Sequence, residues 1–150
     1  MRVDPKKRVV CNPEDSIDFH GFTGPFVQYT YARIKSVLRK MSTVNACPDS
    51  FGSRQTTVNS QLLPLEKNII VLLEQFPAII EEAATFFDPS KIALYVFNLA
   101  KTFNSFYTEH SIANAESEEK KYLRSMLAQL TAQTIYTGMH LMGIKVPERM

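Results

Sequence analysis

Apolar residues between positions 25 and 41 recur at the spacing of an α-helix. They follow one another at intervals of four, three, four and three: Val27, Tyr31, Ile34, Leu38 and Met41. These intervals return to one side of a helix at each turn. The pattern predicts a helix from about Pro25 to Met41 that buries one side in a core.

The residues before this helix agree with its predicted start. Thr23 or Gly24 is expected to be the N-cap, because threonine and glycine are both favoured at that position. Pro25 then falls in the first turn, where its missing N–H would have no helical partner in any case.

Two helices are predicted in the middle of the chain. Residues 64–76 are strongly apolar, so we expect a largely buried helix there. Pro77 is expected to end it at Phe76, because a proline disfavours the helical conformation of the residue before it. A third, short helix would begin at Pro77, with Glu81 and Glu82 facing water.

The C-terminal half predicts two further helices. One should extend from Pro89, capped by Asp88, to about Glu109, with apolar residues at helical spacing. The other should be capped by Ser117 and end near Met142, with Gly143 as the C-terminal stop.

The remaining segments are irregular. Residues 6–12 are compatible with a short strand, which the turn sequence at 12–15 would end. Residues 42–60 are polar and rich in turn formers, so a surface loop is expected. The predicted fold class is all-α, a bundle of about five helices with a short irregular or strand-like N-terminal segment.

A second stripe on the first helix mixes aromatic rings and cations. It lies well away from the apolar face and contains Phe26, Tyr29, Arg33, Ser36 and Lys40. Unpaired nucleic acid prefers such a mixture, because bases stack on rings while cations meet phosphates. Two alternatives remain open on pattern alone. The rings could pack against a neighbouring helix, or the stripe could bind a partner helix in a protein-interaction domain.

Composition narrows the other possibilities only slightly. The 150 residues fit one domain, and the net charge of +2 neither requires nor excludes a polyanionic partner. Cys11 and Cys47 are too few for a disulfide framework and are expected to be reduced thiols in the cytoplasm. The three histidines lie far apart, so no metal site is predicted. No apolar segment approaches the length of a membrane span.

No catalytic constellation is found. Residues 40–43, Lys-Met-Ser-Thr, are similar to an ATP-binding loop of class I aminoacyl-tRNA synthetases, but they follow a predicted helix end, so coincidence is the better interpretation. Glu81 and Glu82 are adjacent on a helix and diverge by about 100°, so they cannot flank one bond.

The segment DFHGFTGPFVQYTYARIKSVLRK, residues 18–40, resembles the helix that opens the C-terminal domain of arginyl-tRNA synthetases. The family pattern is D-F-x-G-x-T-G-P followed by an aromatic residue, an aliphatic residue and Q-Y-x-H-A-R-I. The resemblance continues through the leading residues 4–19, Leu-x-x-Phe-Pro at 73–77, Phe-x-x-Phe-Tyr at 103–107 and the ending LMGIKVPERM. It therefore spans essentially the whole chain, which is similar to a DALR-type anticodon-binding domain.

This resemblance implies a division of the chain and a function. Residues 1–22 would be a connector from a catalytic domain, and residues 23–150 a helical domain that recognises the anticodon loop of arginine tRNA. The catalytic domain would attach arginine using ATP with magnesium. The present chain would carry no cofactor or catalytic residue. The implied protein is cytoplasmic, without membrane association, and is expected to be a monomer that acts with its own catalytic domain.

The resemblance also implies site residues. In relatives the anticodon loop is held by aromatic residues and a terminal methionine, which correspond here to Tyr29, Tyr107 and Met150. Phe26, one turn from Tyr29, occupies a position where many relatives have tyrosine. Arg33 and Lys40 would meet phosphates.

Some residues depart from the family pattern. Tyr31 stands where histidine is common and is expected to be a packing residue, because it lies on the apolar face. His20 and Phe22 replace asparagines, which leaves the local turn geometry open. In the tail, Ile144 and Val146 are expected to be apolar anchors on either side of Lys145.

Overall fold

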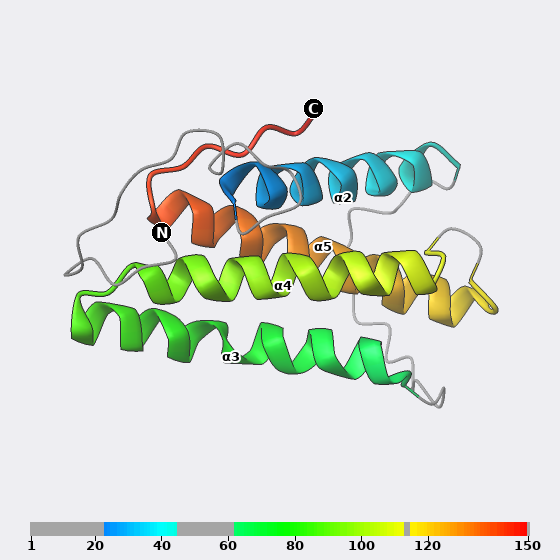
Figure 1. Ribbon diagram of the computed structural model, residues 1–150. Helices are drawn as coiled ribbons and strands as arrows, with labels where there is room; N and C mark the ends of the chain where they lie inside the picture. The colour runs from blue at the N-terminus through cyan, green and yellow to red at the C-terminus, as the bar shows by residue number, and fades with distance from the viewer. Residues whose placement is uncertain (1–22, 45–61, 113–114, 150) are drawn as a thin grey trace, which may run out of the picture.

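The computed structural model describes residues 23–44, 62–112 and 115–149. These ranges contain four helices, α2 (Gly24–Val44), α3 (Pro64–Phe86), α4 (Ser90–Glu109) and α5 (Glu118–Leu141), and no strand (Figure 1). The prediction of an all-α bundle is confirmed. The predicted strand at 6–12, the connector 1–22 and nearly all of the predicted loop at 42–60 lie outside the described residues.

Helices α4 and α5 form the centre of the bundle, and each packs against the other and against both remaining helices. In Figure 1, α2 and α3 lie on opposite sides of α4, with α5 behind. All four helices contribute side chains without solvent exposure to one core, including Ile34, Ile69, Phe103 and Ile135. Helix α4 therefore contacts α2, α3 and α5, and some of its side chains lie against α2.

The predicted apolar face of α2 is confirmed. Val27, Tyr31 and Ile34 are buried, and Leu38 and Met41 pack partly buried against the same core. The Thr23 hydroxyl accepts a 3.4 Å hydrogen bond from the Phe26 N–H, as expected for an N-cap residue. The helix ends at Val44, three residues beyond the predicted end, so the Lys-Met-Ser-Thr segment lies within its last turns.

The predicted helix break at Pro77 is wrong, because α3 continues through this residue. Proline removes one backbone hydrogen bond, which favours a break or a kink. Packing on both sides of Pro77 opposes the break: Ile69 and Ala83 are buried, and the Phe76 ring stacks on Tyr95 of α4 at 5.5 Å. The Tyr95 hydroxyl also donates a 2.7 Å hydrogen bond to the Leu72 carbonyl, in the turn before the proline.

Both ends of α5 follow the predicted capping, whereas the start of α4 differs: its N-cap is Pro89, which makes no side-chain cap hydrogen bond. The Asp88 carboxylate accepts from the Ser90 N–H at 3.0 Å, although α4 begins at Ser90, one residue later than predicted. The Ser117 hydroxyl accepts from the Lys120 N–H at 3.2 Å. Gly143 has a φ of 74°, and its N–H donates to the His140 carbonyl while the Ile144 N–H donates to Met139. This is the Schellman arrangement, which requires a left-handed residue and so favours glycine.

A buried ion cluster joins the start of α3 to the start of α5. The Glu66 carboxylate has no solvent exposure and accepts from Lys120 Nζ at 2.8 Å and Arg124 Nε at 3.1 Å. It also accepts from the Leu63 N–H at 3.0 Å. Burial alone would raise the pKa of Glu66, but these hydrogen bonds outweigh it and hold the pKa below its ordinary value.

The chain after α5 returns along α2. Ile144 and Val146 pack partly buried against the core, as expected for anchors. Gln28 Nε2 donates a 2.7 Å hydrogen bond to the Lys145 carbonyl, and Lys35 Nζ lies 3.4 Å from a carboxylate oxygen of Glu148. Figure 1 shows this tail beside α2.

Candidate nucleic-acid interface

Two tyrosines and one arginine meet where α2 packs against α4. Tyr29 and Arg33 are one turn apart on α2, and Tyr107 lies near the end of α4. The Arg33 guanidinium carbon is 4.6 Å from the centre of the Tyr29 ring and 5.9 Å from the centre of the Tyr107 ring. Both distances are within the range of cation–π attraction. We call Tyr29, Arg33 and Tyr107 the aromatic–arginine cluster.

Hydrogen bonds fix the arginine within this cluster. Arg33 Nη2 donates to the Tyr29 hydroxyl at 3.0 Å, and Arg33 Nη1 donates to Asn104 Oδ1 at 3.2 Å. These bonds use two of the five N–H donors that a guanidinium carries. Donors therefore remain on Arg33 for a further acceptor such as a phosphate or a base edge.

The rings of the cluster are accessible to a partner. Tyr29 is 43% exposed, and Tyr107 is partly buried. Tyr107 stacks on the buried Phe103 ring at 6.4 Å with an angle of 15° between the planes, so its orientation is held from the core side. Neither phenol is enclosed in the interior, which leaves ring surface for stacking.

Residues 27–150 match the family model described as the DALR anticodon binding domain. The chain belongs to this family. The resemblance noted in the sequence is thereby confirmed.

Curated relatives of the DALR domain are considerably longer proteins. This chain is 45% identical over 150 residues to the arginine–tRNA ligase of Flavobacterium psychrophilum. It is 41% identical over 157 residues to the arginine–tRNA ligase of Parabacteroides distasonis. Each alignment covers 100% of this chain and 24% of the relative. The chain thus spans about a quarter of the length of these relatives.

Solved structures give the same fold. The arginyl-tRNA synthetase of Thermus thermophilus matches with a TM-score of 0.83 and 31% identity, over 99% of this chain and 25% of that chain. The arginyl-tRNA synthetase of Plasmodium falciparum matches with a TM-score of 0.77 over 99% of this chain and 25% of that chain. Its 22% identity makes this second match a likeness of fold alone.

The other predicted site residues occupy different environments on the DALR domain. Phe26 is partly buried and its ring lies 5.1 Å from Phe97, so it packs α2 against α4. Lys40 is exposed on the same stripe as Arg33, two turns further along α2. Met150 lies outside the described residues, and Arg149 before it is exposed. The structure therefore brings together Tyr29, Arg33 and Tyr107, whereas Phe26 packs on Phe97 and Lys40 lies further along α2.

Sequence reasoning missed Asn104, which contacts Arg33 directly. It lies inside the Phe-x-x-Phe-Tyr segment at 103–107, three residues before Tyr107, and this position on the same side of α4 is the only signal in the sequence. A polar residue between two core phenylalanines is ordinary at a helix surface.

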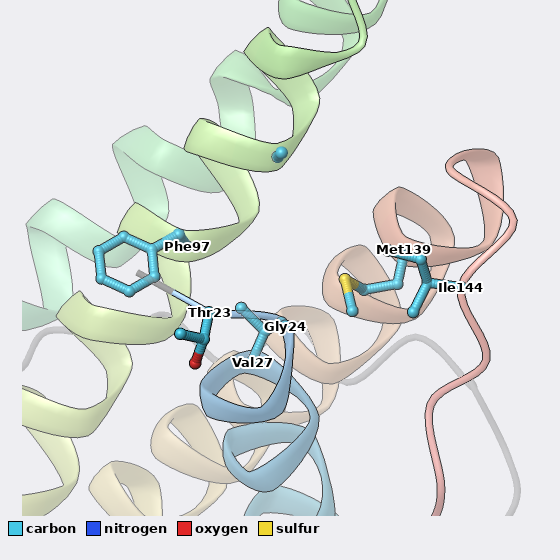
Figure 2. A pocket seen from close by; sticks show the side chains of 7 residues that line it. Thr23, Gly24, Val27, Phe97, Met139 and Ile144 are labelled. Carbon is cyan, nitrogen blue, oxygen red and sulfur yellow. The ribbon is translucent and has the colours of Figure 1, made fainter. Parts of the chain in front are cut away.

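Two hollows in the described residues lie apart from the aromatic–arginine cluster. One cavity of about 90 Å³ lies between the start of α2, α4 and the end of α5, lined mainly by apolar groups such as Val27, Phe97 and Met139 (Figure 2). Ligand pockets are usually several hundred Å³, so this cavity is small for one. A larger apolar groove of about 470 Å³ lies between Phe87 and Leu141, at the opposite end of α4 from Tyr107.

The described residues contain neither a cluster of metal ligands nor a membrane-spanning helix. No group of three or more His, Cys, Asp or Glu side chains is placed to hold a metal ion within these ranges. The same ranges contain no helix with both the length and the apolar character needed to cross a bilayer.

Proposed function

We propose that this chain binds the anticodon loop of arginine tRNA through the aromatic–arginine cluster, as part of an arginine–tRNA ligase. The observation that carries the proposal is the exposed Tyr29 ring with the Arg33 guanidinium 4.6 Å from its centre. The family to which the chain belongs supports RNA as the ligand. The names of its longer relatives support a tRNA that carries arginine.

In the proposed mechanism the tyrosine rings stack on bases, and the cationic side chains bind phosphates or base edges. Splayed bases of the loop stack on the faces of Tyr29 and Tyr107, because every base has an aromatic face. Arg33 and Lys40 meet phosphates or base edges with their N–H groups. Phe26 contributes mainly by holding α2 against α4, and Met150 adds apolar contact to the loop.

The catalytic part of the reaction belongs to the portion of the relatives that this chain does not cover. We infer that the chain acts as a monomer in the cytoplasm, joined to its catalytic domain, and positions the tRNA for that domain.

A partner-helix site on the same stripe is the competing function. Such a site needs a continuous apolar surface without flanking cations. Here the Phe26 ring is engaged by Phe97, and the exposed Tyr29 ring is covered on one side by Arg33. These contacts favour RNA as the ligand.

Binding of an arginine anticodon stem-loop tests the proposal. Tyr29→Ala and Tyr107→Ala should each weaken binding about tenfold, because each removes one stacking platform. Affinity of the parent chain should also fall when salt is raised from 50 to 200 mM, since cations released from RNA phosphates favour the complex. Fluorescence anisotropy with a labelled stem-loop measures both effects.

The matched control is Tyr122→Ala, which removes an exposed tyrosine from α5 instead. Equal losses for Tyr122→Ala and Tyr29→Ala would contradict a site at the cluster. Equal affinity for a stem-loop with a substituted anticodon would contradict selective reading of arginine tRNA and leave general RNA binding intact.

A further inference from the structure

Arg33 is restrained more than a surface arginine usually is. Long side chains lose rotamer freedom when they bind a ligand, and this loss reduces affinity. Arg33 is fixed before any ligand arrives, since it donates to Tyr29 on its own helix and to Asn104 on α4. The bond to Asn104 matters most, because it ties the guanidinium to a second helix.

Asn104 is itself held in one orientation. Its Nδ2 donates a 2.8 Å hydrogen bond to the Thr30 hydroxyl, and that hydroxyl donates at 2.9 Å to the Phe26 carbonyl. The Thr30 hydroxyl hydrogen is thus used, so the Thr30 oxygen can only accept from Asn104. The opposite end of the amide, Oδ1, must then face Arg33, which can only donate.

The first residue in this series of hydrogen bonds, Thr30, is held rigidly. Thr30 has no solvent exposure and lies in the interface between α2 and α4. The orientation of Arg33 therefore depends on a buried hydroxyl through one amide side chain. Neither Thr30 nor Asn104 is placed to stack on a base, because one is buried and the other is an amide.

We propose that Asn104 is a positioning residue for RNA recognition, which holds Arg33 against Tyr29 in the geometry that the anticodon loop meets. This inference rests on the proposed function, since it concerns the same site. Asn104 acts through Arg33 and not through its own contact with RNA.

The binding test compares single and double variants. Asn104→Ala should weaken stem-loop binding about five- to tenfold, the fold-change of one lost hydrogen bond of ordinary strength. In the Arg33→Met background the same substitution should cause almost no further loss, because the residue through which it acts is gone. Asn98→Ala is the matched control, since Asn98 is an exposed asparagine on the same helix.

Variants of Thr30 test the hydrogen bond between Asn104 and the Thr30 hydroxyl. Thr30→Val has nearly the same shape without the hydroxyl, and it should weaken binding as Asn104→Ala does. Thr30→Ser restores the hydroxyl and is the conservative rescue. Thermal unfolding of each variant shows whether it is folded at the assay temperature.

A readout without RNA separates this inference from the function on which it rests. In nitrogen-15 NMR spectra, the Arg33 Nη hydrogens should give separate signals in the parent chain, because rotation of the guanidinium is slowed by its two bonds. Asn104→Ala and Thr30→Val should merge these signals, whereas Asn98→Ala should leave them separate.

The outcomes are distinguishable. If the parent chain fails to bind the stem-loop, the proposed function and this inference both fall, whatever the NMR spectra show. If Arg33→Met weakens binding but Asn104→Ala changes neither the affinity nor the Arg33 signals, the inference alone is overturned. Additive losses in the double variant would also overturn it, because Asn104 would then act independently of Arg33.

Discussion

At the scale of single residues, Phe87 is the least expected side chain in the structure. It follows the last residue of α3 with φ 53° and ψ 39°, the left-handed conformation, and the residue is 89% exposed. A side chain with a Cβ atom in this conformation costs about 1–2 kcal/mol relative to the right-handed one. Glycine is the usual choice at such a helix end.

Phe87→Gly should therefore stabilise the domain. The relief of strain exceeds the extra freedom that glycine gives the unfolded chain, so we expect the free energy of unfolding to rise by about 0.5–1 kcal/mol. Phe86→Gly is the control, because Phe86 is exposed but right-handed, and there glycine should destabilise by about 1 kcal/mol. Urea denaturation measures both, and effects of the same sign would contradict the explanation.

The sequence predicted part of the candidate site, and the remainder depended on contacts between helices. The spacing of Tyr29 and Arg33 on one stripe could be read directly, because it lies within a single helix. Asn104 could not be found in this way, because its partners Thr30 and Arg33 are 74 and 71 positions away. The inward packing of Phe26 likewise depends on Phe97 of α4, which the pattern of α2 alone does not reveal.

At the scale of helices, α4 and α5 approach closely at Gly138. A Cβ atom built there would lie 2.5 Å from Cγ2 of Val96, a residue without solvent exposure. Gly138 is thus required by the neighbouring helix, although glycine is unfavourable inside a helix by about 1 kcal/mol.

Gly138→Ala should destabilise the domain by about 1–2 kcal/mol, since overpacking a core outweighs the gain in helix propensity. Val96→Ala opens space at the contact, so the double variant should be more stable than the sum of the two single effects predicts. Thermal unfolding of the three variants gives this coupling, and strict additivity would count against the close contact.

The helices also show where sequence patterns are reliable. Capping by Ser117 and the stop at Gly143 were predicted correctly, because each depends on residues within a few positions. The break at Pro77 was predicted wrongly for the opposite reason. Burial of Ile69 and Ala83 against other helices decides that α3 continues, and this energy does not appear in the local sequence.

At the scale of the whole molecule, the buried ion cluster joins segments far apart in the chain. Glu66 of α3 accepts from Lys120 and Arg124 of α5, and Arg124 Nη1 donates at 2.9 Å to the Ser111 carbonyl, four residues beyond Tyr107. The segment that follows α4, close to Tyr107, is therefore attached to α5 through Arg124, which also binds Glu66 of α3.

This cluster should make the free energy of unfolding depend on pH. The folded-state pKa of Glu66 lies below its unfolded value, so the cluster contributes fully above the unfolded pKa and its contribution is lost as pH falls through the folded one. Glu66→Gln should cost about 3–5 kcal/mol at pH 7, because it removes the buried carboxylate that Lys120 and Arg124 share. The difference between the parent chain and this variant should shrink as the pH falls below 4.5.

Denaturation at a series of pH values measures this difference. Glu74→Gln is the control, because Glu74 is an exposed carboxylate on the same helix. A difference between the parent chain and Glu66→Gln that stays constant down to pH 3 would contradict the assigned role of Glu66.

The two tyrosines of the aromatic–arginine cluster have a practical consequence for fluorescence measurements. The chain contains six tyrosines and no tryptophan, so its near-ultraviolet emission comes from tyrosine alone. Two of those six fluorophores, at positions 29 and 107, stand beside Arg33. Replacing Tyr29 by tryptophan would give the chain a single red-shifted emitter at the proposed contact, and contact quenching by a nucleobase could be followed there without any dye.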